Sequence, residues 1–122
     1  MAVKPDRRKM GAQLAAELVA DKWFIRIVHQ LEDGTKRYGE LRRNLPSVSQ
    51  RMLTRTLRNI ERDGLVSRKV YAVVPPKTEY ALTELGQSLI EPLHGLCQWA
   101  ERHFPRVQAH RLRDAGRPKG AP

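Results

Sequence analysis

Apolar residues follow a helical repeat most clearly between residues 45 and 65. At about 100° per residue, Leu53, Leu57 and Ile60 fall within roughly 60° of one another. Gly64 follows as a stop signal, because glycine readily takes the left-handed conformation that ends a helix. The opposite side of the predicted helix carries four arginines: Arg51, Arg55, Arg58 and Arg62. One face is therefore built to bury and the other to meet an anion, although the pattern alone also fits a solvated surface helix.

Two helices are predicted nearer the N-terminus, over residues 9–20 and Lys22–Glu32. Asp21 is a good N-cap for the second of them, and Gly34 can end it. The apolar positions with helical spacing are Leu14, Leu18 and Val19 in the first helix and Trp23, Ile27, Val28 and Leu31 in the second. We expect Trp23 to be a core residue rather than a binding platform.

A short third helix is predicted over Arg37–Asn44, with Tyr38, Leu41 and Leu45 facing inward. Pro46 ends it, because proline lacks a donor and clashes with the preceding turn. Ser47 or Ser49 then caps the arginine-bearing helix. A short helix, a tight turn and an arginine-faced helix form a helix-turn-helix.

The repeat changes after residue 65. Val66–Tyr71 and Thr78–Leu82 are rich in strand formers, and Pro75 and Pro76 between them predict a turn. A helix-turn-helix followed by a β-hairpin is a winged helix-turn-helix. The predicted fold class is therefore mainly α with a small β-hairpin.

Thr83 is predicted to cap a last helix that runs to about residue 104. Pro92 lies inside it and should kink it. Its apolar face is formed by Leu85, Leu89, Leu93, Leu96, Ala100 and Phe104. The expected organisation is a flexible basic arm at 1–8, a single domain at 9–104 and a basic disordered tail at 105–122.

The first and last helices carry more apolar surface than a small winged domain needs to bury. This excess favours a two-fold homodimer, which would present two recognition helices to a symmetric site. The predicted dimer interface consists of Leu14, Leu18, Leu89, Leu93, Leu96, Trp99 and Phe104.

Charge is unevenly distributed over the 122 residues, whose net charge is +10. Residues 36–69 hold ten basic and three acidic residues, and both termini are also basic, whereas the segments between them are slightly acidic. This distribution favours a polyanionic partner, with nucleic acid as the first candidate. A membrane surface is less favoured, because no basic amphipathic helix has an exposed aromatic face.

Several other classes find little support in the residues. No apolar run has the length of a membrane span, and the N-terminus has no apolar signal region, so a cytoplasmic location is expected. Cys97 is the single cysteine, and none of the four histidines is paired in a metal-binding pattern. No phosphate loop or nucleophile elbow is present, so neither an enzyme nor a resident cofactor is expected. No cluster of polar residues indicates a site for a small-molecule effector, so the sequence leaves open whether the protein binds one.

Residues 21–99 resemble the HxlR-type winged helix-turn-helix transcriptional regulators. The resemblance rests on six motifs in this order and spacing: Lys22-Trp23, Arg37-Tyr38-Gly39-Glu40-Leu41, Ser49-Gln50-Arg51-Met52-Leu53-Thr54, Glu61-Arg62-Asp63-Gly64-Leu65, Pro75-Pro76-Lys77-Thr78-Glu79-Tyr80 and Leu82-Thr83-Glu84-Leu85-Gly86. It implies a cytoplasmic homodimer that binds operator DNA. Many members of that family sense oxidants through a cysteine ahead of the first helix, and this chain has none there. Cys97 reads as a small buried hydrophobe more readily than as a sensor.

Contacts to DNA are predicted from the helix-turn-helix and the wing. Base contacts are assigned to the N-terminal half of the recognition helix, which enters the groove first: Gln50, Arg51, Thr54 and Arg55. Backbone contacts are assigned to Lys36, Arg42, Arg43, Ser47, Ser49, Arg58 and Arg62, and wing contacts to Arg68, Lys69 and Lys77. The predicted function is sequence-specific regulation of transcription on a pseudo-palindromic operator. A sequence-nonspecific architectural protein is the alternative, because basic tails add affinity without reading bases.

Overall fold

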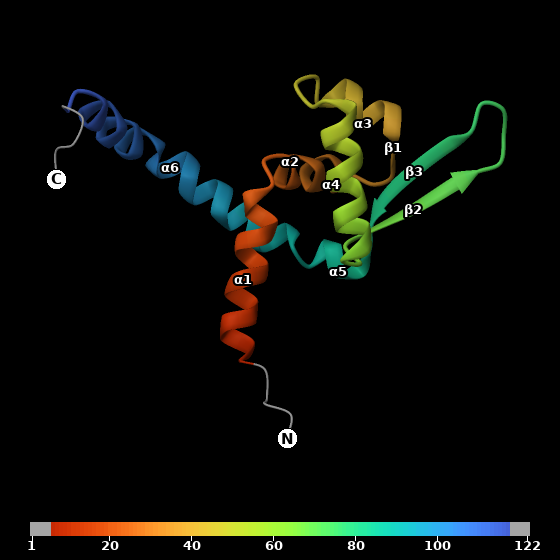
Figure 1. Cartoon of the computed structure of the whole chain (residues 1–122), viewed down its shortest axis with the longest axis horizontal. Coiled ribbons are helices and arrows are strands. Elements are labelled where there is room, and N and C mark those ends of the chain that lie inside the picture. Colours follow the sequence, from red (N-terminus) through yellow and green to blue (C-terminus); the bar gives the residue numbers. More distant parts are fainter. Residues whose placement is uncertain (1–5, 118–122) are drawn as a thin grey trace. The chain divides into compact units, whose positions relative to one another are not determined.

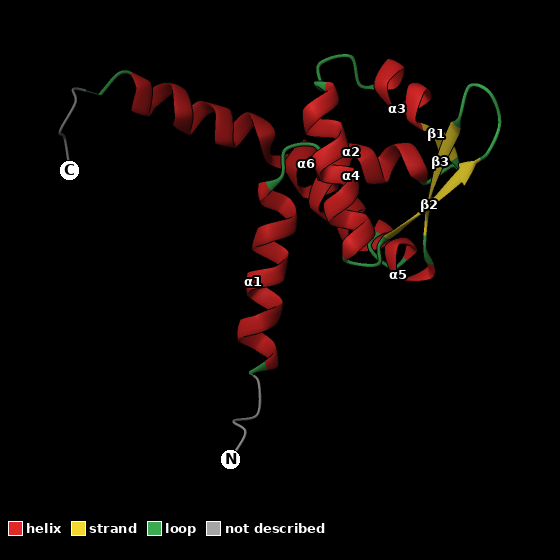
Figure 2. Ribbon diagram, turned by 45° about the vertical axis from the view of Figure 1, so that its right-hand side comes forward, coloured by secondary structure: helices red, strands yellow, loops and turns green. Residues whose placement is uncertain are grey.

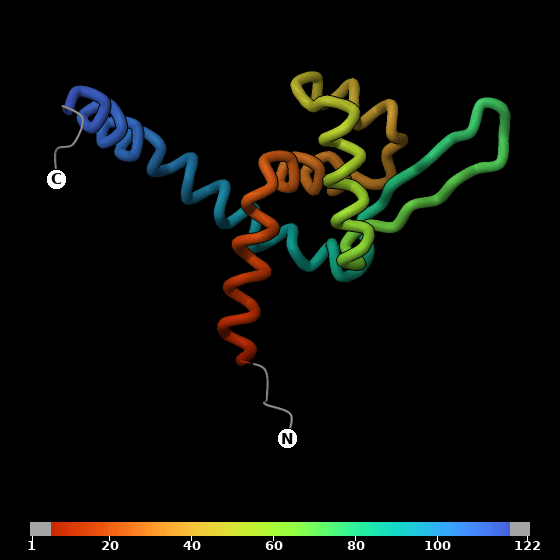
Figure 3. The backbone as a smooth tube through the Cα atoms, viewed as in Figure 1, coloured from red at the N-terminus to blue at the C-terminus, as the bar shows by residue number. Residues whose placement is uncertain are grey.

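The computed structural model describes residues 6–117, and the path of the chain can be followed in Figure 3. The chain divides into two compact units, residues 1–90 and residues 91–122. The elements of the described residues are, in order, α1 (Arg7–Ala20), α2 (Phe24–Leu31), β1 (Lys36–Arg37), α3 (Tyr38–Asn44), α4 (Gln50–Arg62), β2 (Val66–Tyr71), β3 (Lys77–Leu82), α5 (Glu84–Gln87) and α6 (Ile90–Ala115). The first unit therefore contains the predicted helix-turn-helix and hairpin, and the second contains α6 from Glu91 onward.

Helices α2, α3 and α4 of the first unit (Figure 1) contain most of its buried apolar side chains, to which Val66 of β2 and Tyr80 of β3 add. Trp23 is 2% exposed, which confirms its predicted place in the core, and its ring lies beside the cationic groups of Lys22 and Arg26. The largest fully buried side chains are Phe24, Ile27, Val28, Leu41, Leu53 and Leu57. All but Phe24 belong to the apolar positions predicted from helical spacing, so the periodicity identified the buried faces correctly.

The ends of α4 are defined by local hydrogen bonds. Of the two serines proposed as its cap, Ser49 holds this position, and its Oγ accepts from the backbone N of Met52 at 3.1 Å. At the other end, Leu65 N donates to Ile60 O and Gly64 N donates to Glu61 O. These are the two hydrogen bonds of a Schellman motif. Gly64 has a φ of 78°, which favours glycine there. Both boundaries of the arginine-bearing helix are thus encoded by adjacent residues.

The sheet has three antiparallel strands in the order β1-β3-β2. Strands β2 and β3 form the predicted hairpin, with Val66 opposite Leu82 and Tyr71 opposite Lys77. Figure 2 shows the two strands, in yellow, extending away from the helices to a long loop. Strand β1 was not predicted, because two residues are too short to show an alternating pattern. It ties the start of α3 to the wing through Lys36, which pairs with Tyr80.

The single last helix predicted from Thr83 is two helices. Thr83 caps α5 as expected, since its Oγ1 accepts from Gly86 N at 3.1 Å, but α5 ends at Gln87. The predicted kink at Pro92 is wrong, because Pro92 is the third residue of α6. In the first turn of a helix the missing N–H of proline has no partner to lose. The predicted helix is therefore interrupted at residues 88–89, between α5 and α6.

The predicted basic tail is also shorter than expected. Residues 105–115 continue α6, although Pro105 lies inside the helix. The segment after Pro105 is rich in arginine, alanine, leucine and glutamine, which are strong helix formers, and this outweighs the glycine and proline content that favoured disorder. The remaining residues of that predicted tail lie at 116–122, of which 118–122 are outside the described residues.

Helix α1 begins two residues earlier than predicted. Asp6 caps it by accepting from Arg8 N and Lys9 N at 3.1 and 3.2 Å, so Arg7 and Arg8 belong to the helix rather than to an arm. Residues 1–5 of that predicted arm lie outside the described residues. None of the residues of α1 is buried.

Asp21 connects the start of α2 with α4. Its Oδ1 accepts from Trp23 N at 2.9 Å, in the turn before α2. The predicted N-cap role of Asp21 is wrong, because α2 begins only at Phe24 and its N-cap residue is Trp23. Its Oδ2 accepts from the hydroxyl of Thr56 at 2.7 Å. Thr56 is 3% exposed, so this bond satisfies a buried hydroxyl and holds the two helices together.

Candidate nucleic-acid interface

The two faces of α4 differ as sharply as the sequence predicted. Leu53, Leu57 and Ile60 are at most 2% exposed, whereas the four arginines of the opposite face are exposed. Part of that outer face forms an open depression of about 640 Å³ lined by Gln50, Arg51, Thr54, Arg55, Arg58 and Asn59. All four residues predicted to contact bases therefore lie together on one open surface of the helix.

The arginines of α4 differ in their intramolecular partners. Arg62 forms an ion pair with the adjacent Asp63, with 3.3 Å between Nε and Oδ1. Within residues 6–117, Arg51, Arg55 and Arg58 have no carboxylate at ion-pair distance. Three guanidinium groups on one exposed helix face thus keep their charge and their donors for an external partner.

The N-terminal half of α4 is attached to α3 through one side chain. The hydroxyl of Tyr38 lies 3.1 Å from the hydroxyl of Thr54 and 3.4 Å from the carbonyl oxygen of Gln50. Tyr38, predicted only to face inward, is half-buried, and its hydroxyl forms these contacts. Within residues 6–90, Thr54 is the one predicted base-contacting residue whose side chain has a hydrogen-bond partner.

The wing is linked to α4 by a charged pair. Arg68 of β2 lies 3.4 Å from Glu61, measured from Nε to Oε2, and α4 packs on β2. On the same strand the ammonium of Lys69 lies 4.9 Å from the centre of the Tyr71 ring. Of the three predicted wing contacts, Arg68 therefore has an intramolecular partner on α4 and Lys69 has one on β2.

Lys77 lies in a different setting. It lines an open depression of about 370 Å³ between α3 and the loop end of the wing, together with Arg37 and Arg43. Arg37 is also 4.0 Å from Glu79, and its backbone N donates to Glu40. The sequence predicted Arg43 as a backbone contact and Lys77 as a wing contact. It missed Arg37, because the pairing of β1 with β3 is what places this residue beside the wing.

The remaining predicted backbone contacts lie around the turn. Arg42, Arg43, Ser47 and Ser49 are exposed, and Lys36 is half-buried in β1. The Ser49 hydroxyl accepts a bond from the helix backbone, which leaves its proton free to be donated outward. These residues supply both cationic groups and a hydroxyl donor beside the start of α4.

Tyr80 lies buried on β3, at the sheet position that faces Arg68 on one side and Lys36 on the other. Burial raises the pKa of this phenol above its usual value of 10, and Glu61 and Tyr38 act in the same direction. Arg68 and Arg58 oppose this rise in the pKa. Tyr80 is therefore a neutral support of the wing at physiological pH.

The residues predicted for a dimer interface differ in exposure. Leu14, Leu96, Trp99 and Phe104 are between 45% and 57% exposed, which is high for such apolar side chains. Leu18 and Leu89 are half-buried, and Leu93 is buried. Cys97 is half-buried on α6. The exposed four are the members of the set that remain open to a partner.

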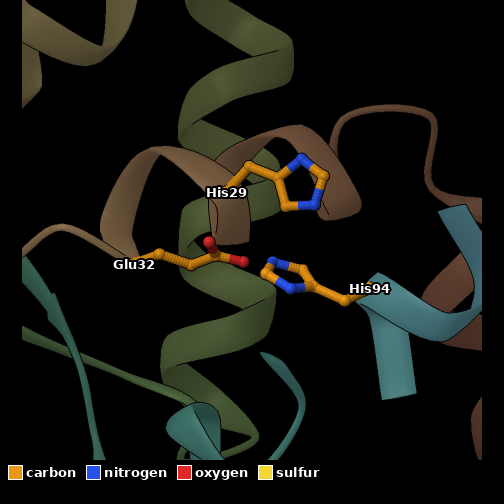
Figure 4. Close-up of side chains that lie close together, drawn as sticks. All are labelled: His29, Glu32 and His94. Carbon is orange, nitrogen blue, oxygen red and sulfur yellow. The ribbon is translucent and has the colours of Figure 1, made fainter. Parts of the chain in front are cut away.

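The histidines are distributed over α2 and α6. Figure 4 shows the side chains of His29 on α2, Glu32 directly after α2 and His94 on α6. The ring of Trp99 lies 5.1 Å from that of His103, one helical turn away.

No helix in the described part of the chain is both long and apolar enough to cross a membrane.

The helix-turn-helix, the three-stranded sheet and the exposed arginine face define a winged helix-turn-helix DNA-binding protein. The chain belongs to the HxlR-like helix-turn-helix family, whose model matches residues 18–108. It is a DNA-binding transcription regulator of that family.

Individual relatives agree with this assignment. The HTH-type transcriptional regulator YkvN of Bacillus subtilis is 48% identical over 111 residues, which cover 84% of this chain and 94% of YkvN. The structure of the transcriptional regulator ytfH from Salmonella typhimurium is 38% identical and covers 83% of this chain and 90% of that one, with a TM-score of 0.73. The redox regulator HypR in its reduced form is also 38% identical, covers 81% and 98%, and has a TM-score of 0.76.

Proposed function

We propose that this protein is a sequence-specific regulator that binds a pseudo-palindromic operator as a cytoplasmic homodimer. The observation that carries the proposal is the outer face of α4, where three exposed arginines have no carboxylate partner within residues 6–117. An α-helix fits the major groove, and arginine is the commonest reader of guanine there. A surface that served only solubility would not need its charges gathered on one helix face beside a wing.

The proposed base contacts follow from side-chain chemistry. Arg51 and Arg55 suit guanine, Gln50 suits adenine, and the methyl group of Thr54 suits the thymine methyl. Their place on one open surface of α4 supports a joint role.

Backbone contacts are proposed for the groups around this surface. Arg58 and Arg62 follow on α4, and Lys77 with Arg43 lines the depression between α3 and the wing. Cations placed in this way neutralise phosphates and set the register of the protein on DNA without reading its sequence. The same role is proposed for Lys36, Arg42, Arg68 and Lys69. Ser47 and Ser49 are proposed to donate hydroxyl hydrogen bonds to phosphate oxygens instead.

The homodimer is supported by the exposed apolar residues of α1 and α6. Leu14, Leu96, Trp99 and Phe104 would each lose unfavourable contact with water at an interface. A two-fold dimer places two copies of α4 at half-sites one helical turn, about 10 base pairs, or a multiple of it apart.

Competition binding tests the proposal against an architectural role. A preferred duplex is selected from a random library with the full chain, and its affinity is compared with that of random duplex at physiological salt. A specific regulator should prefer the selected duplex by about a thousandfold or more. Equal affinity for both would show sequence-nonspecific binding instead.

A further inference from the structure

The bond between Tyr38 and Thr54 bears on how the recognition helix reads DNA. Tyr38 is the first residue of α3, and its hydroxyl reaches two positions of α4 that are 12 and 16 residues away in sequence. Both positions, Gln50 and Thr54, line the open surface of α4. Tyr38 itself does not line that surface, so its effect on DNA would be exerted through Thr54.

The hydroxyl of Tyr38 has two neighbours on α4. It lies 3.4 Å from the carbonyl oxygen of Gln50, which can only accept. The 3.1 Å contact joins it to the Thr54 hydroxyl, and either of these two hydroxyls can be the donor. In both directions the Thr54 hydroxyl has a hydrogen-bond partner inside the protein, so it is less available to a base edge than the hydroxyl of a free threonine.

We propose that Tyr38 is a specificity-determining positioning residue, which engages the Thr54 hydroxyl so that Thr54 presents its methyl group to the major groove and selects thymine. The inference rests on the proposed function, in which α4 reads base edges. Threonine can contact several bases through its hydroxyl, but only thymine offers a methyl group in that groove. A fixed side chain also loses less entropy on binding than one that is free to rotate.

Replacement of thymine by deoxyuridine, which lacks only the methyl group, tests the inference. Each thymine of the duplex selected by the full chain is replaced in turn, and the affinities of wild type and Tyr38→Phe are compared. For wild type, one position in each half-site should lose about fourfold in affinity, the value expected for one methyl-sized contact. For Tyr38→Phe, the loss at that position should fall below about twofold, because the Thr54 side chain is no longer held.

Substitutions of Thr54 separate its methyl group from its hydroxyl. Thr54→Ser keeps the bond to Tyr38 but lacks the methyl group, so its affinity should be the same with thymine and with deoxyuridine. Thr54→Val offers a methyl group whether or not Tyr38 holds the side chain. Its affinity should therefore still fall when thymine is replaced by deoxyuridine. These two variants test the methyl contact even where Tyr38→Phe folds poorly.

Tyr71→Phe is the matched control. It also removes a tyrosine hydroxyl that forms a side-chain hydrogen bond, to Glu79 at 3.0 Å, but in the wing. It should keep the wild-type response to deoxyuridine. Equal responses of Tyr38→Phe and Tyr71→Phe would overturn the inference.

Failure of the inference and failure of the proposed function give different results. A wild-type protein that binds its selected duplex specifically but tolerates deoxyuridine at every position contradicts this inference alone. A wild-type protein that prefers no duplex over random DNA contradicts the proposed function and the inference with it.

Discussion

At the scale of single residues, the arginines of α4 show how the same side chain can have different roles. Arg55 is exposed and lines the open surface of the helix, whereas Arg62 is paired with Asp63. An arginine that reads guanine through two hydrogen bonds contributes to specificity, and one that touches a phosphate contributes to affinity for every sequence. The sequence separated Arg55 from Arg62 only by position along the helix, and the ion pair of Arg62 adds a second difference.

Arg55→Ala is predicted to weaken binding to the selected duplex by about 1–3 kcal/mol and to relax preference at one position of each half-site. Arg62→Ala is the matched control on the same helix, and it should weaken selected and random duplexes alike. Titrations with both duplexes at one salt concentration measure the two effects. Unchanged affinity of Arg55→Ala for the selected duplex would contradict the assignment of α4.

Tyr80 gives a prediction on stability at alkaline pH. Burial raises its pKa in the folded state, so above pH 10 the unfolded chain ionises this phenol before the folded chain does. Its contribution to stability is fully present below pH 10 and is lost as the pH rises through the raised pKa. Tyr80→Phe should therefore lose less free energy of unfolding than wild type between about pH 9 and pH 11. Parallel stability curves from urea titrations of the two proteins would contradict this.

At the scale of elements, Gly86 shows how closely α5 approaches the end of α4. A Cβ built at Gly86 would overlap the carbonyl oxygen of Leu65 and crowd Leu82. This oxygen also accepts from Thr83 N, so it cannot easily move. The glycine is needed here for space, since its φ lies outside the left-handed region.

Gly86→Ala is predicted to lower the free energy of unfolding by about 1–3 kcal/mol through this overlap. Gly95→Ala is the matched control, because nothing lies within 4 Å of a Cβ at that position of α6. It should leave the stability unchanged or raise it by up to about 1 kcal/mol, since alanine is the better helix former. Urea unfolding at a fixed protein concentration measures both, and equal stabilities would contradict the argument.

The wing gives a prediction on salt dependence. Lys77 lines the depression beside α3, whereas the ammonium of Lys69 is held over Tyr71. Lys77→Ala should weaken all duplexes alike and lower the slope of log affinity against log salt by about one in each half-site. Lys69→Ala should change the slope less. A larger change of the slope for Lys69→Ala than for Lys77→Ala would contradict this and would assign the phosphate contact to Lys69.

At the scale of the whole molecule, the exposed apolar residues of α6 predict the state of association. Trp99→Glu would place a charge in the proposed interface, and burial of an unpaired charge is costly. The dissociation constant of the dimer should rise at least about tenfold, which corresponds to about 1.4 kcal/mol. Val74→Glu is the control, because Val74 is 100% exposed at the end of the wing. Sedimentation at micromolar concentration measures both, and a monomeric wild type would contradict the dimer.

The elements that the sequence predicted well depend on neighbouring residues. The apolar repeat of α4, its Ser49 cap and its Gly64 stop all act within a few positions, as do the strand formers of the hairpin. The errors arose at prolines, because a proline can start, kink or end a helix, and the sequence does not show which of these occurs. The last helix was expected to be kinked at Pro92, but this residue lies in the first turn of α6. Disorder was expected from Pro105 onward, but α6 continues through Pro105 to Ala115.

By itself the sequence determined the fold class, the family and the exposed arginine face of α4 that we propose binds DNA, because periodicity and capping are local properties of the chain. Only the tertiary structure decided how the candidate site is supported. It added β1, paired Arg68 with Glu61 and placed Tyr38 against Thr54. These contacts join residues that are 7 to 44 positions apart, and such distant pairs are set by how elements pack rather than by any repeat in the sequence.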